Sequence, residues 1–443
     1  MKRQNRATRR VFLKTASTAA AAAAGLPCVV PSAALGKDGA VAPSERIVMG
    51  SIGTGGQGSG NMRNFMGQKD VRLVAVCDVD RGHRDGAKNT VDKHYGNQDC
   101  AAYKDFREMV ARKDIDAVSI GTPDHWHALT TIAAAKSGKD VYCEKPLANS
   151  VGEGRAMCKA VGENKRVLQC GSHERSNNSG RYACELVRNG VIGKLHTVRI
   201  NLPTEQGHHQ QVLRMEEKSE MPATQTVPEG FDYDFWLGHT PMKPYTPMRC
   251  HFWWRFILAH GGGEMTDRGA HVIDIGQLGA GKDDTGPVEI EATGWHDTKG
   301  LFDAFFKYKF VNTFADGLKM IGTTDQPRGV RFEGDRGWIM VHIHGCGLEA
   351  SDPKILQTKT DDFKVQVGRS PGHHRDFLEC VKSRKATMAT AEIGHRTATL
   401  CHLNNIAMLV GRKLKWDPVR EQIIGDDEAA ALLTPKMRPP WRL

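Results

Sequence analysis

Residues 47–58 read IVMGSIGTGGQG, an apolar run that passes directly into a glycine-rich turn. The run 47–52 predicts a buried β-strand, and Gly53, Gly55 and Gly58 complete the pattern Gly-x-Gly-x-x-Gly. In a strand–turn–helix unit, the first glycine permits the tight turn and the second lets the backbone approach a pyrophosphate. The third lets the helix pack close to the strand, and the helix N-terminus supplies N–H groups to the phosphates. The stretch therefore predicts a dinucleotide-binding fold.

Four more short apolar runs follow and alternate with segments of helical period. The runs are 72–77, 116–121, 140–143 and 167–170, and the clearest helical segments are 105–113 and 125–137. Short buried strands that alternate with helices indicate a parallel sheet with helices on both faces. We therefore predict an α/β fold whose first domain, residues 45–170, is a Rossmann domain.

The second predicted strand ends at Asp78, 25 residues after Gly53. A carboxylate at this position binds the ribose hydroxyls of the cofactor and repels a 2′-phosphate. NAD is therefore the expected cofactor, and NADP is less favoured. Arg81 lies close enough in the sequence to soften that preference.

Two further motifs, GTPDHWH at 121–127 and EKPLA at 144–148, stand where predicted strands end. Ligands of open α/β sheets bind at the carboxyl ends of the strands. Pro146 keeps Lys145 out of helical geometry, so the lysine side chain is able to point into the cleft. The residues expected to bind the cofactor are Gly53, Gly55, Gly56, Gln57, Gly58, Asp78, Thr122, Pro123, His125, Glu144 and Lys145.

Asp267, His271 and Asp274 follow a run of three glycines at 261–263. On a helix, their spacing of i, i+4 and i+7 places the three side chains on one side. A histidine oriented by a carboxylate is a good general base. Asp267 and His271 are therefore candidate catalytic residues.

No metal site is predicted, because no second histidine cluster at suitable spacing converges on these three residues. The remaining adjacent histidine pairs are expected on the surface or in loops. These pairs are His208-His209 and His373-His374.

Together these motifs resemble the glucose–fructose oxidoreductase / inositol dehydrogenase / rhizopine-catabolism (Gfo/Idh/MocA) family. Further matching stretches are CDVD at 77–80 and GGGEMTDRGAHVID at 261–274. The resemblance extends from Arg46 to about Pro418. It implies that residues 171–418 form an α/β domain with a large, open, mostly antiparallel sheet, and residues 419–443 are expected to form an extended tail.

The resemblance also implies an activity, the NAD(P)-dependent oxidation or reduction of a secondary alcohol of a sugar, polyol or related small molecule. It implies that Lys145 lies near the nicotinamide and the reacting hydroxyl. His271 would be the proton-transferring group and Asp267 its acidic neighbour. A homo-oligomer formed through the exposed sheet face is the assembly that the resemblance implies.

Aromatic residues are concentrated in 228–238 and 252–255, within and after a segment rich in Pro, Gly and Gln. They suit a carbohydrate-binding face, because rings stack on sugar C–H surfaces, and they equally suit core packing or a subunit contact. The residues expected to bind the substrate are His173, Arg175, Trp254, Arg255 and Asp274.

The first 36 residues resemble a bacterial twin-arginine signal, with TRRVFLK at 8–14, an alanine-rich stretch and small residues at 32–36. We therefore expect export to the periplasm. The chain has 61 Lys and Arg against 51 Asp and Glu, and six of the basic residues lie in the leader. The remainder carries 55 against 51, or +4, so a nucleic-acid partner is not indicated. No later stretch reaches about 18 apolar residues, so no membrane span is predicted.

Ten of the 11 cysteines lie beyond the leader, several of them in apolar runs. Because the twin-arginine route carries folded proteins, we expect mostly free, buried thiols. The sequence thus favours an exported oxidoreductase that holds NAD tightly. A redox-assisted glycosidase or lyase with catalytic NAD is the alternative, and a non-catalytic sugar-binding protein is the third hypothesis.

Overall fold

The structure is a computed structural model that describes residues 41–203, 210–212, 214, 224–295, 300–325, 327–345 and 347–443. Residues from Ile47 onward form one compact unit. Before Ile47 the described residues contain a short 3-10 helix, Pro43–Glu45. The leader at 1–36 and the pair at 208–209 lie outside the described residues, so those expectations stay predictions.

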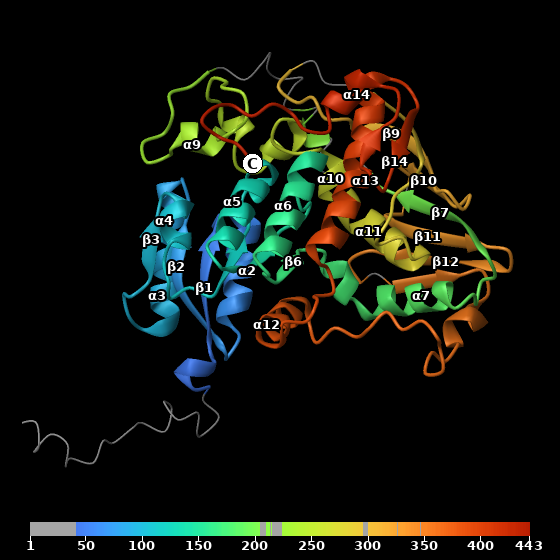
Figure 1. Cartoon of the computed structure of the whole chain (residues 1–443), viewed down its shortest axis with the longest axis horizontal. Coiled ribbons are helices and arrows are strands. Elements are labelled where there is room, and N and C mark those ends of the chain that lie inside the picture. The colour runs from blue at the N-terminus through green and yellow to red at the C-terminus, as the bar shows by residue number, and fades with distance from the viewer. Residues whose placement is uncertain are drawn as a thin grey trace, which may run out of the picture. The chain divides into compact units, whose positions relative to one another are not determined.

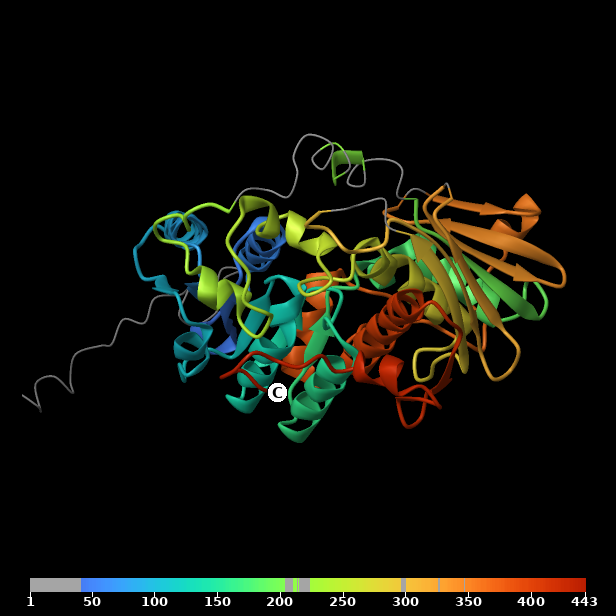
Figure 2. The same cartoon turned by 90° about the horizontal axis from the view of Figure 1, so that it is seen from above.

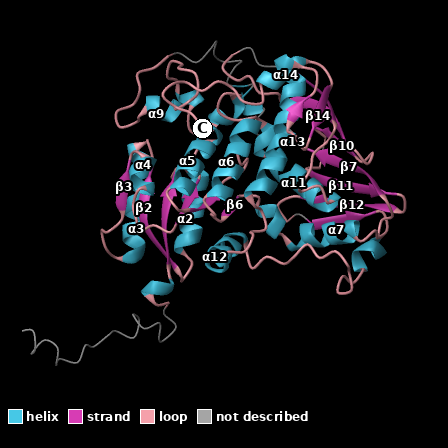
Figure 3. Cartoon of the chain, viewed as in Figure 1, coloured by secondary structure: helices cyan, strands magenta, loops and turns pink. Residues whose placement is uncertain are grey.

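The first domain contains a six-stranded sheet in the order β3-β2-β1-β4-β5-β6, and every neighbouring pair is parallel (Figures 1 and 3). The predicted Rossmann fold is confirmed. The strands are β1 (Ile47–Ile52), β2 (Val71–Cys77), β3 (Ala101–Tyr103), β4 (Ala117–Ile120), β5 (Asp140–Cys143) and β6 (Leu168–Cys170). Sequence reasoning missed β3, because three residues carry too little periodicity to mark a strand.

Helices cover both faces of this sheet, as the alternating pattern requires. The apolar side chains of α4 (Phe106–Val110), α5 (Asp124–Lys136) and α6 (Val151–Glu163) share one core cluster with the strands. On the other face, α2 (Gly56–Met66) and α3 (Arg81–Tyr95) share a second cluster with α12 (His373–Ser383). A helix from the far end of the chain therefore completes the Rossmann domain.

The placement of α12 corrects the surface assignment of His373 and His374. His373 is buried, and the His374 ring stacks on Tyr142 with centroids 5.2 Å apart. The two histidines form the first turn of α12, which packs on the sheet. The sequence showed them as an adjacent polar pair, but the helix packs its first turn against Tyr142 of β5, far earlier in the chain.

The second domain contains a nine-stranded sheet in the order β13-β12-β11-β7-β10-β9-β8-β14-β15. Among the strand pairs that the structure describes here, β10–β7 is parallel and the others are antiparallel, which confirms the mostly antiparallel sheet. The strands are β7 (Leu195–Asn201), β8 (Glu289–Trp295), β9 (Lys307–Thr313), β10 (Lys319–Thr323), β11 (Gly329–Gly334), β12 (Gly337–His342), β13 (Gly347–Ala350), β14 (Leu414–Asp417) and β15 (Gln422–Ile423).

The helices that lie against this sheet include α7 (Asn178–Arg188), α11 (Gly269–Ala280) and α13 (Ala391–Val410). Helix α13 contacts both β8 and α6, so it joins the two domains. Figure 2 shows it in red between the Rossmann domain and the second sheet. The inward side chains of β9, such as Tyr308 and Phe310, are fully buried in the largest core cluster. The homo-oligomer expected through the opposite face stays a prediction.

The residues after β14 are not a free arm. They form β15 and α14 (Asp427–Ala431), and the last stretch then runs beside α9 (Tyr233–Leu237) (Figure 1). The Trp441 ring stacks on Phe235 with centroids 5.6 Å apart, and Arg438 pairs with Asp234 at 2.7 Å. The tail thus holds α9 in place.

Nine cysteines lie in the described part of the chain, and all nine are free. Eight of them are buried. The expectation of mostly free, buried thiols is confirmed for the described cysteines, since all nine are free and only Cys158 is partly exposed. Within the same described ranges, no helix combines the length and apolar content needed to cross a membrane.

Glu153 of α6 is a buried carboxyl whose side chain accepts a hydrogen bond from the Asn149 N–H. Burial raises its pKa from 4.5 to about 8. The folded protein therefore keeps a proton that the unfolded chain releases. Its contribution to the free energy of unfolding is fully present below about pH 4.5 and is lost as the pH rises to about 8.

We predict that Glu153→Gln flattens this pH dependence. Between about pH 5 and about pH 8, the unfolding free energy of the wild type should fall by about 3 kcal/mol more than that of the variant. Urea unfolding at several pH values measures the difference. Glu163→Gln, at the exposed end of the same helix, is the matched control and should follow the wild type. Parallel pH curves for wild type and Glu153→Gln would contradict the prediction.

Candidate active site

A cavity of about 690 Å³ opens where the carboxyl ends of the Rossmann strands meet the second domain. All the residues expected to bind the cofactor line it except Gly58 and His125. Of the expected substrate residues, His173, Trp254 and Arg255 line it, whereas Arg175 and Asp274 do not. The three candidate catalytic residues, Lys145, Asp267 and His271, all face the same cavity.

The glycine-rich turn begins the cofactor end of the cavity. Gly53 has φ +77°, and a Cβ there would lie 2.6 Å from the Thr122 backbone nitrogen. A Cβ on Gly58 would lie 1.9 Å from the Gly53 carbonyl oxygen. Gly58 therefore lets α2 pack against the turn, as the motif requires, and it does this from behind the cavity wall.

Asp78 stands at the end of β2, at the edge of the same turn. One of its carboxylate oxygens accepts the Thr54 N–H at 2.8 Å, and the other accepts the Asp80 N–H at 2.9 Å. Burial raises the pKa of Asp78, and the two N–H groups oppose that rise. The carboxylate is thus held rigidly where the ribose of NAD is expected. The glycine turn, the N-terminus of α2 and Asp78 fit a dinucleotide, and the cofactor would supply the hydride acceptor.

Lys145 and Asp267 form an ion pair across the domain boundary. The Lys145 Nζ lies 2.7 Å from Asp267 Oδ1 and 2.8 Å from the Asp267 carbonyl oxygen. Burial alone would raise the pKa of Asp267, but the charges of Lys145 and Arg255 outweigh it and hold that pKa well below its usual range. Burial likewise opposes the charge of Lys145, yet Asp267 outweighs it and raises the lysine pKa. Lys145 is therefore a charged hydrogen-bond donor.

The expected pairing of Asp267 with His271 is corrected. No hydrogen bond joins these two side chains in the part of the chain that the structure describes. Asp267 ends α10 (Glu264–Asp267), whereas His271 lies in α11, which begins at Gly269. The break at Arg268 turns Asp267 toward Lys145. His271 is buried, which lowers its pKa well below the usual range, and its Nδ1 has no hydrogen-bond partner among the described residues.

Arg175 and Asp274 lie away from the cavity and bind each other. The Arg175 Nη2 is 2.7 Å from Asp274 Oδ1 and 2.7 Å from Asp283 Oδ1. Both Arg175 and Asp274 are almost fully buried. Their place in this ion-pair network gives them a structural role in holding the 3-10 helix His173–Ser176 against α11. The sequence located both residues near the site but did not show that they face each other.

His125 also lies behind the cavity wall. Its Nε2 is 2.9 Å from the Trp236 carbonyl oxygen, and the Trp126 Nε1 donates to the same oxygen at 2.9 Å. Burial lowers the His125 pKa to about 3. His125 therefore ties α5 to α9, while its neighbour Trp126 faces the cavity.

The sequence left open whether the aromatic segments pack in the core or line the binding site, and they do both. Phe231, Tyr233, Trp236, Tyr245 and Trp254 belong to one buried cluster. Of these, Phe231, Trp236 and Trp254 also line the cavity. These rings therefore pack together and form one wall of the site.

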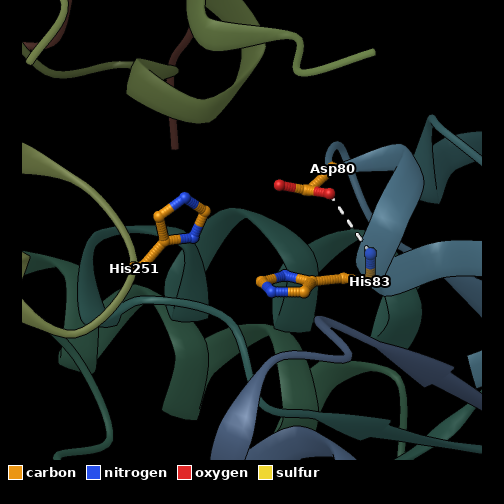
Figure 4. A group of neighbouring side chains, drawn as sticks. All are labelled: Asp80, His83 and His251. Atoms are coloured by element: carbon orange, nitrogen blue, oxygen red, sulfur yellow. Dashed lines mark hydrogen bonds between the residues drawn. The ribbon is translucent and has the colours of Figure 1, made fainter. Parts of the chain in front are cut away.

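Residues 228–256, which we call the covering segment, bind to the Rossmann domain beside Asp78. The Arg81 N–H donates to the Gly230 carbonyl oxygen at 2.9 Å, and Lys104 pairs with Asp232 at 2.9 Å. His251 of this segment faces His83 with ring centroids 5.4 Å apart, and Asp80 lies beside them (Figure 4). The covering segment thus closes the cofactor end of the cavity.

His344 lines the opposite wall of the cavity and was missed by sequence reasoning, whereas Glu174 was expected near the cleft together with His173 and Arg175. Glu174 is buried next to His173, and His344 lies in the turn between β12 and β13. The His344 N–H donates to Glu174 Oε1 at 3.1 Å. The adjacency of Glu174 to His173 was visible in the sequence, but nothing there indicated that His344 approaches them.

Two family models match the chain. The one described as "Oxidoreductase family, NAD-binding Rossmann fold" matches residues 47–172, and "Oxidoreductase family, C-terminal alpha/beta domain" matches residues 178–443. The chain belongs to the Gfo/Idh/MocA family of NAD-binding oxidoreductases. The resemblance drawn from the motifs is confirmed, and so is the NAD-binding domain.

Curated relatives match part of the chain. A myo-inositol 2-dehydrogenase of Thermotoga maritima is 32% identical over 34% of this chain and 44% of its own length. A glycosyl hydrolase family 109 protein of Shewanella baltica is 32% identical over 42% of this chain and 44% of its own length. This chain therefore spans less than half the length of these relatives.

The fold is shared over most of the chain with solved structures. The aldose–aldose oxidoreductase of Caulobacter crescentus, solved with glycerol, aligns with a TM-score of 0.59 at 19% identity. The alignment covers 84% of this chain and 99% of that one. At this identity the likeness concerns the fold.

We predict that Gly58→Ala disrupts the cofactor site, because its new Cβ would meet the Gly53 carbonyl oxygen. The variant should lose about 1–3 kcal/mol of unfolding free energy and at least about nine-tenths of its bound NAD. Gly60→Ala is the matched control, since a Cβ there meets no atom within 4 Å. Thermal unfolding and NAD content per chain measure both effects. Equal NAD content in the two variants would contradict the assignment.

Proposed function

We propose that this chain is an exported, NAD-dependent oxidoreductase that acts on a secondary alcohol of a sugar or polyol and retains its cofactor between turnovers. The observation that carries the proposal is the meeting of Lys145 and His271 on the wall of the cavity that begins at the glycine-rich turn. The inositol dehydrogenase and aldose oxidoreductase among its relatives support the substrate class.

Lys145, His271 and Asp267 have separate roles in removing the proton of the reacting hydroxyl. NAD, when bound, accepts the hydride from the carbon that carries the reacting hydroxyl. Lys145 donates a hydrogen bond to that hydroxyl oxygen and stabilises the negative charge that develops on it. His271 accepts the hydroxyl proton at a ring nitrogen. Asp267 holds Lys145 in place and keeps it charged, so it acts as a positioning residue.

Export would require that the cofactor be bound before transport, since free NAD is scarce outside the cytoplasm. The covering segment supports such retention, because it bonds to the Rossmann domain at Arg81 and Lys104, next to the expected ribose site. Release of NAD would require these contacts to open. The leader at 1–36 supports the twin-arginine route and thus a periplasmic location.

A second candidate, a redox-assisted glycosidase or lyase, is favoured by the relatives named glycosyl hydrolase family 109 and 2,7-anhydro-N-acetylneuraminate hydratase. Transient oxidation would acidify the C–H bond beside the new carbonyl and allow the leaving group to be eliminated. In a glycosidase, water would then add across the resulting C=C bond, and the hydride held on the bound NAD would be returned to the carbonyl carbon. The third hypothesis, a non-catalytic binding protein, is disfavoured because Lys145, Asp267 and His271 all face the cavity.

The proposal predicts that the exported protein, purified without added nucleotide and then denatured, releases close to one NAD(H) per chain. Mass spectrometry of the supernatant distinguishes NAD(H) from NADP(H). An empty site, or NADP(H) in place of NAD(H), would overturn the retained-NAD proposal. The same preparation should oxidise one sugar while reducing another, and release of an aglycone without net NADH would select the glycosidase alternative.

Lys145→Met should lower kcat by about 100-fold or more while leaving NAD bound, because Lys145 acts on the charge that develops during the reaction. His271→Gln should do the same. Lys159→Met, on the exposed face of α6, is the matched control and should keep full turnover. Turnover of each variant is measured with the sugar pairs or glycosides on which the wild type is active. Full turnover in both active-site variants would disprove the mechanism.

A further inference from the structure

A second group of side chains that the proposed hydride transfer does not use lies beside His271. His173 Nε2 is 3.3 Å from Glu174 Oε1, and His344 Nδ1 is 3.1 Å from the same oxygen. The ligand atoms of the three residues all lie within 4.8 Å of one another. In a tetrahedral site with metal–ligand bonds of about 2.0–2.1 Å, neighbouring ligand atoms are about 3.3 Å apart. The three side chains therefore already have nearly the spacing that a metal ion requires.

The buried charge of Glu174 also favours a bound cation. The carboxylate is almost fully buried, with its side chain 4% exposed. Among the described residues, no lysine or arginine lies within 4.0 Å of it, because the neighbouring Arg175 turns away and binds Asp274 and Asp283. A buried carboxylate is costly without a compensating charge. A divalent cation shared with the two imidazoles would supply that charge.

The backbone holds this group in place. The His344 N–H donates to Glu174 Oε1 at 3.1 Å, so the carboxylate is oriented by the residue that supplies one of the imidazoles. His344 has φ +67°, a left-handed conformation that is uncommon for residues other than glycine. Such conformations persist where the surrounding structure determines them, and they are concentrated at functional sites.

His271 provides an independent sign of a ligand. Its ring lies 4.5 Å from that of His173 and 5.7 Å from that of His344, measured between centroids. His271 is 6% exposed, yet its Nδ1 has no hydrogen-bond partner among the described residues. A metal-bound water or substrate oxygen in the cavity would give this nitrogen a partner.

From this arrangement we infer that His173, Glu174 and His344 bind one first-row divalent metal ion, such as Zn²⁺ or Mn²⁺, at the substrate end of the cavity. Two imidazoles and one carboxylate suit these ions and leave coordination positions open. A hydroxyl or keto oxygen of a polyhydroxy substrate would occupy an open position beside His271. This role for the substrate rests on the proposed function, whereas metal binding itself does not.

The other histidine–carboxylate group, Asp80 with His83 and His251, belongs to the cofactor end (Figure 4). Asp80 Oδ1 already accepts the N–H groups of Gly82 and His83 as the N-cap of α3. Asp80 also lies two residues from Asp78, where the ribose is expected. This group therefore serves as the comparison for the metal site and not as a competing proposal.

The test uses the full exported chain, treated with a chelator and then dialysed against Zn²⁺ or Mn²⁺ alone. Metal content measured by plasma mass spectrometry should be close to one ion per chain for the wild type. His173→Gln and Glu174→Gln should each fall below about one tenth of an ion per chain. His83→Gln is the matched control and should retain the full metal content.

Two features keep the test decisive. Glu174→Gln preserves the shape of a buried side chain and an acceptor for the His344 N–H. Should it nevertheless fail to fold, His173→Gln alters a half-exposed side chain and still tests the site.

Absence of metal from the folded wild type, or loss of metal in His83→Gln with retention in His173→Gln, would overturn the inference. NAD content of the same samples separates the two proposals, because a metal-free variant that keeps NAD leaves the proposed function intact.

Discussion

The ion pair between Lys145 and Asp267 is the interaction on which the site depends. Each partner alone would be a charge buried in a cavity wall, which costs several kcal/mol when uncompensated. Together they join the end of β5 to the end of α10, and thus the Rossmann domain to the second domain. The pair therefore sets where the cofactor end and the substrate end of the cavity meet, and it keeps Lys145 charged at that point.

Not every buried charge near the cavity belongs to the site, and the Arg175–Asp274 ion pair stabilises the fold. Three successive residues show the division: His173 faces the cavity, Glu174 faces two histidines, and Arg175 points the other way into an ion-pair network. A tight 3-10 helix directs successive side chains to different sides. Proximity in the sequence therefore says little about which of these residues reaches the ligand.

Two long-range packing contacts complete the architecture around the cavity. Helix α12 returns to cover one face of the Rossmann sheet, and the C-terminal tail packs Trp441 on Phe235 beside α9. The covering segment is thus supported from both sides, by the Rossmann domain and by the tail. These contacts hold the covering segment over the cofactor end of the cavity.

The sequence by itself determined the Rossmann fold, the glycine turn, Asp78 and the positions of Lys145 and His271. These features are local, because a strand, a tight turn and a helix start are specified by adjacent residues and by backbone geometry. The family resemblance also predicted the mostly antiparallel sheet of the second domain. Only the tertiary structure decided that Asp267 binds Lys145, that Asp274 binds Arg175, and that His344 reaches Glu174. These outcomes depend on partners from distant segments, and the direction of a side chain in a folded core cannot be deduced from its spacing along the chain.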